Sequence, residues 1–67
     1  MALRLQIEIE REEDGRWIAE IPAVPGAIAY GADKREAVRR AKAIALGVLS
    51  DRSYSEDFDS IEFSQAS

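Results

Sequence analysis

Residues 22–37 read P-A-V-P-G-A-I-A-Y-G-A-D-K-R-E-A and mark the point at which the chain changes from strand to helix periodicity. Both prolines and two of the four glycines of the chain lie here. Pro22 and Pro25 cannot donate to a strand ladder, and Gly26 accepts backbone angles that other residues avoid. The stretch therefore predicts the end of one strand, a stiff connection and a short strand over residues 27–30.

A helix-start signal closes this stretch. Gly31 ends the short strand, and Asp33 followed by Glu36 is the Asp form of a capping box, which satisfies the free N–H groups of a first helical turn. From Lys34 onward, apolar residues recur at helical spacing and form one stripe about 140° wide. The stripe comprises Ala37, Val38, Ala41, Ile44, Ala45, Val48 and Leu49. This pattern predicts an amphipathic helix packed on a sheet.

Strand signals lie on both sides of that helix. Apolar residues alternate with charged or polar ones over residues 3–10, which is typical of a strand with one buried face. The pair Asp14-Gly15 then favours a hairpin with a primed turn, because Gly15 tolerates positive φ. A second strand is expected over residues 16–21, with Trp17 on the core side, and a last strand over residues 60–64.

The resulting order, β-β-β-α-β, predicts an α+β fold. Its first three strands form an antiparallel meander, and a helical crossover places the fourth strand parallel to the first. The helix covers one face of the sheet and the other face stays wet. The whole chain, residues 1–67, is one domain, and it is so short that we expect a homo-oligomer.

Composition excludes several classes of function. The chain has no cysteine and no histidine, which removes disulfides, thiolate zinc sites and imidazole catalysis. The net charge of −4 argues against non-specific binding of nucleic acid and favours a basic partner. We expect no cofactor and no metal. The alternating N-terminus lacks the apolar core of a signal peptide, and no apolar run is long enough for a membrane span, so a cytoplasmic protein is expected.

Two surfaces could still carry chemistry. Four carboxylates fall on the wet face, where they could hold Mg²⁺ and act as a residual metal-dependent nuclease: Glu8, Glu10, Glu20 and Glu62. The competing interpretation is that strand alternation places glutamates in solvent without any function.

The outer helix face collects Arg35, Arg39 and Lys42 around Leu46. It is either a contact patch, with weak nucleic-acid binding as one option, or an ordinary solvated face. Residues 51–59 are acidic, and their Tyr54 and Phe58 could pin that segment to the domain.

A set of residues in this order resembles the pattern of HicB-like antitoxins: Gly15-x-Trp17, Pro22-x-Val24-Pro25-Gly26, Tyr30-Gly31, Asp33 and Glu36-Ala37. The resemblance covers nearly all of the chain. It implies a truncated RNase H-like fold without catalytic residues, and a partner of the HicA type, a small basic RNase toxin. The residues expected to contact such a partner are Trp17, Val24, Pro25, Tyr30 and Leu46.

The chain departs from that pattern in places. Ala23 and Ala32 stand where the family often has acidic residues, and Asp33 replaces the usual Thr or Ser cap. The sequence stops at Ser67, before the DNA-binding segment that many members carry, so no DNA binding is expected. A solitary HicB-like protein that oligomerises and has no toxin is the alternative.

Overall fold

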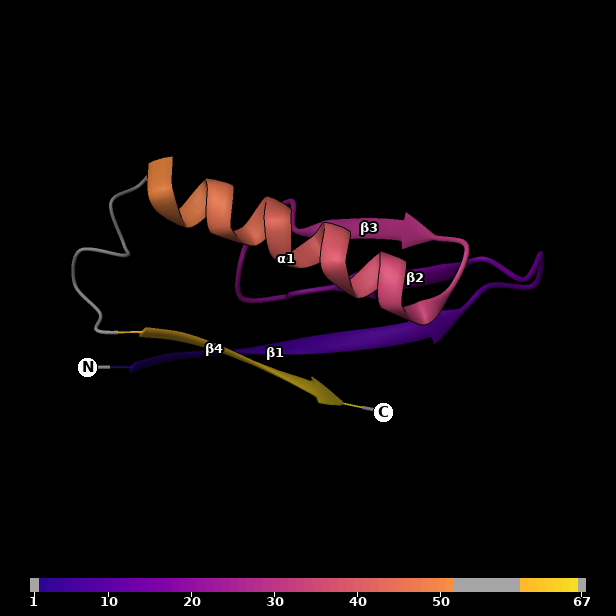
Figure 1. The fold of residues 1–67 in the computed structure, drawn as a ribbon, viewed down its shortest axis with the longest axis horizontal. Coiled ribbons are helices and arrows are strands. Elements are labelled where there is room, and N and C mark those ends of the chain that lie inside the picture. The colour runs from indigo at the N-terminus through magenta and orange to yellow at the C-terminus, as the bar shows by residue number, and fades with distance from the viewer. Residues whose placement is uncertain (1, 52–59, 67) are drawn as a thin grey trace.

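The computed structural model, which describes residues 2–51 and 60–66, is a four-stranded sheet with one helix on one face (Figure 1). Its elements are β1 (Ala2–Arg11), β2 (Trp17–Glu20), β3 (Ile28–Gly31), α1 (Lys34–Asp51) and β4 (Ser60–Ala66). The strand order is β3-β2-β1-β4, with antiparallel pairs except for the parallel pair β1–β4. The predicted α+β fold and its topology are confirmed.

The register of the strands separates the two faces of the sheet. Ile9, Ala19 and Ala29 lie side by side on the face that α1 covers, and Leu5 lies opposite Phe63 on the same face. These rows and the helix stripe enclose the core. The buried apolar residues are Leu5, Ile7, Ala19, Ile21, Val24, Ala27, Ala37, Val38, Ala41, Ala45 and Leu49.

Small side chains let α1 lie close to the sheet. Ala37, Ala41 and Ala45 are fully buried, and Ala19 is fully buried on β2. The helix packs mainly against β2 and β3 and less against β1. Since an α-helix is about 10–12 Å wide and strands lie about 4.8 Å apart, one helix covers about two strands.

The prediction that Ile44 belongs to the core stripe is wrong, because 38% of its surface is exposed. Arg40, one turn earlier on the same side of α1, donates to the carbonyl oxygen of Tyr30 on β3. This side of the helix therefore lies beyond the outer side of β3, which is an edge strand of the sheet. No further strand of the described chain lies there to cover Ile44.

The hairpin between β1 and β2 is confirmed, but its predicted two-residue primed turn is wrong. The amide of Gly15 donates to the carbonyl of Glu12 at 3.0 Å, and the amide of Glu12 donates to the carbonyl of Arg16 at 2.7 Å. Gly15 has φ of 92°. These bonds describe a three-residue loop in which a turn is followed by a bulge glycine, which is the next most common hairpin geometry.

The proline-rich connection consists of two consecutive turns. The amide of Val24 donates to the carbonyl oxygen of Ile21 at 2.9 Å. The amide of Ala27 donates to the carbonyl oxygen of Val24 at 3.1 Å. Pro22 and Pro25 therefore occupy the second position of their turns, which their fixed φ favours. Gly26 follows Pro25 with φ of 85°, as a type II turn requires.

The capping box at the start of α1 is confirmed with one difference. The amide of Glu36 donates to Asp33 Oδ1 at 2.8 Å, while Glu36 Oε1 accepts from the amide of Ala32 at 3.0 Å. The glutamate thus reaches back one residue further than in the usual arrangement. The helix begins at Lys34, as the sequence predicts.

Some strand ends differ from the predicted ones. The second strand is shorter than 16–21, because the amide of Ile21 donates to Ala27 across the connection instead of to a neighbouring strand. The last strand is longer than 60–64, because its pairing with β1 continues to Ala66. Tyr54 and Phe58, expected to pin the acidic segment, lie outside the described residues.

Replacement of Gly31 tests how closely the end of β3 approaches α1. A Cβ atom at Gly31 would lie 3.0 Å from both the Cα of Ala37 and the carbonyl oxygen of Asp33, which are backbone atoms that cannot move aside. We expect Gly31→Ala to lower the free energy of unfolding by about 2 kcal/mol in urea titrations. The matched control is Gly47→Ala, where the new methyl meets no atom within 4 Å and the helix gains up to about 1 kcal/mol. Equal effects of the two substitutions would contradict this packing.

Candidate functional site

The sheet face opposite α1, here called the open face, carries an apolar centre among acidic residues. One row across the strands reads Glu10, Ile18 and Tyr30, and the next reads Glu8, Glu20 and Ile28. Ile28 and Tyr30 are each 44% exposed. An apolar surface rimmed by charge on a small protein is typical of a binding site.

The apolar surface continues around the outer edge of β3. Ile28 and Tyr30 lie on the open face, and Ile44 lies on the β3 side of α1, so three of the four exposed large hydrophobic residues of the described chain flank this edge. We call Ile28, Tyr30 and Ile44 the β3 edge surface. No other strand of the described chain pairs with the outer side of β3.

Arg16 links this surface to the acidic hairpin. Its side chain lies over the ring of Tyr30, with Cζ 4.8 Å from the ring centroid, and its Nε donates to Asp14 Oδ2 at 2.7 Å. The backbone amide of Arg16 also donates to Asp14 Oδ1 at 3.0 Å. This amide, together with the guanidinium, lowers the pKa of the Asp14 carboxyl from its ordinary value of 3.8.

The residues expected to contact a partner do not form one site. Tyr30 lies on the open face, whereas Trp17 is half-buried on the core face with Arg11 Cζ 5.9 Å from its ring centroid. Val24 is 3% exposed and therefore offers little side-chain surface to a partner. Pro25 is exposed in the turn before β3, and Leu46 lies on the opposite side of the molecule, in a groove beside α1.

The wet-face carboxylates are spread apart rather than gathered. Glu8 and Glu20 lie directly opposite each other, but Glu62 pairs with Arg4 at 3.1 Å on the far side of β1. Over residues 2–51 and 60–66, no three carboxylates lie close enough to hold a metal ion. The four carboxylates therefore do not form one cluster within the described residues.

Ile18 and Ile28 are the members of the open face that sequence reasoning missed. The sequence did contain the information, because neighbouring residues of a strand point to opposite faces of the sheet. Ile18 is next to the core residue Ala19, and Ile28 is next to the core residue Ala27, so both isoleucines point away from the core. An apolar residue at such a position is exposed by the alternation of the strand. It therefore predicts an apolar side chain on the solvent-facing side of the sheet.

Comparison with family models, with curated proteins and with solved structures finds no match for this chain. Within the described residues, no helix is both long enough and apolar enough to cross a membrane.

The lowered pKa of Asp14 predicts a pH dependence of the hairpin. Because the folded chain holds the carboxylate more favourably than the unfolded chain does, its stabilisation is complete above the ordinary pKa of 3.8 and is lost as the pH falls through the folded value. NMR titration of the carboxyl carbon should give a midpoint below 3.8, and the amide proton of Arg16 should shift at the same pH. In Asp14→Asn that amide shift should disappear. A midpoint at or above 3.8 would contradict the contact.

Proposed function

We propose that this chain is a non-catalytic HicB-like protein that binds and masks a small basic protein, an RNase toxin of the HicA type. The observation that carries the proposal is the open face, on which Ile18, Ile28 and Tyr30 lie among carboxylates beside the free edge of β3. The resemblance of residues 15–37 to HicB-like antitoxins indicates that the partner is a toxin of the HicA type.

The charge of the open face supports a basic partner. Glu8, Glu10 and Glu20 lie on β1 and β2 next to the apolar centre, and the hairpin adds Glu12 and Glu13. Arg16, the nearest cation, is engaged by Asp14, which reduces its repulsion of a basic surface. Complementary charge of this kind accelerates association and selects the partner.

The free edge of β3 supports recognition by strand addition. An extended segment of a partner that pairs with this edge gains main-chain hydrogen bonds, and alternate side chains of β3 give specificity. Ile28 and Tyr30 point to the same face of the strand and would be the central anchors, since exposed aromatic and large aliphatic residues dominate such contacts.

A masking function needs no catalytic group. The chain has no histidine and no cysteine, and its described carboxylates are dispersed, which supports binding rather than hydrolysis. The proposal entails a cytoplasmic protein, because an RNase toxin acts where messenger RNA is translated.

Copurification tests the proposal. The tagged full-length chain, expressed in its own cells, should retain one small basic protein encoded next to its gene, and coexpression should relieve the growth arrest that this protein causes. Ile28→Ser should weaken retention by about tenfold, because it removes an apolar anchor. The matched control is Leu46→Ser, which changes an equally exposed residue on the other side of the molecule.

Two outcomes would contradict the proposal. Recovery of no small basic protein would exclude the antitoxin function and leave the solitary HicB-like alternative. Loss of the partner with Leu46→Ser but not with Ile28→Ser would exclude the open face as the binding surface.

One observation, the apolar β3 edge surface, favours the alternative of a HicB-like protein that has no toxin and forms an oligomer. Two copies that pair their β3 edges about a twofold axis would bury Ile28, Tyr30 and Ile44 of each chain and extend the sheet. Light scattering at micromolar concentration should then give a mass of at least twice 7.4 kDa, and Ile28→Ser should shift it towards a single chain. A mass of 7.4 kDa for the unmodified chain would exclude this oligomer.

A further inference from the structure

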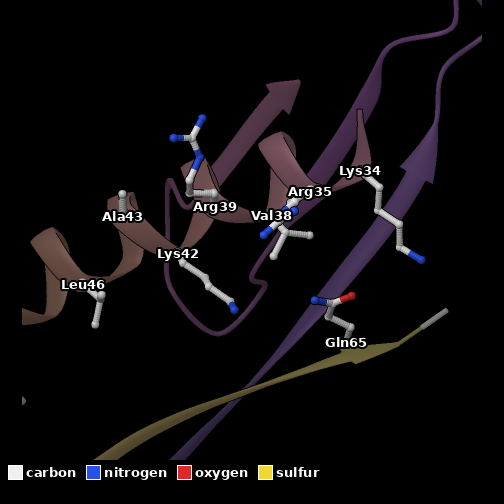
Figure 2. Close-up of a pocket in the computed structure, with 8 residues that line it drawn as sticks. All are labelled: Lys34, Arg35, Val38, Arg39, Lys42, Ala43, Leu46 and Gln65. Carbon is white, nitrogen blue, oxygen red and sulfur yellow. The ribbon is translucent and has the colours of Figure 1, made fainter. Parts of the chain in front are cut away.

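A basic groove lies on the core side of the sheet, between α1 and β4 (Figure 2). Lys34 and Lys42 extend from α1 in the direction of β4, and Gln65 extends from β4 towards α1. The groove has a volume of about 790 Å³, enough for several side chains of a partner. It lies on the other side of the sheet from the open face, so it is a separate surface.

The groove exists because one helix covers only part of the sheet. The helix packs mainly on β2 and β3, and β4 lies beyond β1 at the opposite edge. Ile61 and Phe63 on β4 are consequently only partly buried, although they point to the core face. Within the described chain, α1 is the one helix on the sheet, and its main contacts are with β3 and β2 (Figure 1).

The charge of the groove is strongly positive although the protein is acidic. Lys34, Arg35, Arg39 and Lys42 line it, and none of them has a carboxylate within 4.0 Å among the described residues. By contrast, Arg40 on the other side of α1 pairs with Glu36 at 3.6 Å.

Apolar surface accompanies this charge. Leu46 is 45% exposed at the end of the row of cations, and Ala43, which also lines the groove, is exposed as well. The groove therefore combines an apolar strip with a cationic rim.

Two copies of the chain do not fit together groove to groove about a twofold axis. Two grooves placed face to face would bring four cations against four cations. The acidic open face of another copy would have the right charge, but that contact is head-to-tail and would build a ring or a filament instead of a twofold dimer.

Nucleic acid fits less well than a protein segment. The phosphate backbone would leave Leu46 without an apolar partner. Phe63, the aromatic ring beside the groove, has Lys42 Nζ 5.3 Å from its centroid, so its face is occupied rather than open for a base to stack on.

We propose that the groove binds an acidic amphipathic helix of a partner protein. Such a helix would lie beside α1 at the usual 8–10 Å between axes and would cover β4. Its apolar stripe would contact Ala43 and Leu46, and its carboxylates would face Lys34 and Lys42. This partner has the opposite charge to the one proposed for the open face, so the chain has two binding surfaces and connects two proteins.

A model peptide tests the proposal. The probe is a fluorescein-labelled peptide of about 18 residues, long enough to form a helix, with leucine at helical spacing, glutamate beside the leucine stripe and alanine elsewhere. Fluorescence anisotropy in about 150 mM salt should show saturable binding to the full-length chain. A scrambled peptide of the same composition should bind at least about tenfold more weakly, because its apolar stripe is lost.

Two pairs of substitutions on α1 locate the site. Lys42→Gln should weaken binding by about threefold and Leu46→Ser by about tenfold. Their matched controls, Arg40→Gln and Ile44→Ser, change an exposed cation and an exposed isoleucine on the β3 side of α1, and they should leave the affinity within about twofold. All four residues are accessible to solvent, and thermal unfolding checks that each variant folds.

Several outcomes would overturn the proposal. They are the absence of saturable binding, equal binding of the scrambled peptide, and equal losses in the control variants. Tighter binding of a uridine oligonucleotide with the same charge would make the groove a nucleic-acid site. A mass that grows beyond twice 7.4 kDa with protein concentration in light scattering, and that Leu46→Ser reduces, would indicate head-to-tail assembly. The peptide and oligonucleotide results do not bear on Ile28 or the basic partner, so the two proposals fail independently.

Discussion

One helix has to cover one face of a four-stranded sheet, and this mismatch determines most of what the molecule presents to solvent. Alanines at positions 19, 37, 41 and 45 bring α1 close to β2, which seals the centre of the core with small side chains. At the end of β3, the tight connection into α1 brings the backbone of Asp33 and Ala37 so close that no side chain fits at Gly31. What the helix does not reach becomes surface: the outer side of β3 at one edge and the core face of β4 at the other.

The fold could be predicted from sequence because its signals are local and agree with one another. Strand alternation, two prolines, a capping box and an amphipathic stripe each specify a neighbouring element, and a right-handed crossover leaves few ways to arrange them. The type of the hairpin turn was harder to predict, because a glycine with positive φ at position 15 suits both a primed turn and a bulge. Which of the two forms depends on which residues make the last hydrogen bonds between β1 and β2.

The candidate surfaces were harder to predict, because they depend on where elements sit relative to one another. Ile44 has the helical phase of a core residue, and it is exposed because α1 extends past an edge strand. Leu46 among cations was visible as a helix-face pattern, but the groove needs β4 opposite it, and only the three-dimensional arrangement supplies this. Val24 belongs to the sequence motif that carries the resemblance, yet its burial gives it a role in packing.

The parallel pair β1–β4 has a consequence for the synthesis of the protein. Arg4 and Glu62 are joined by a salt bridge although they lie 58 residues apart in the chain. The chain is synthesised from its N-terminus, so β1 exists before β4, and until β4 pairs with it β1 has an unpaired edge with Leu3 and Leu5 incompletely covered. Unpaired strand edges on partly folded chains recruit other strands. Correct folding therefore requires that β1 stay unpaired with other chains until β4 pairs with it.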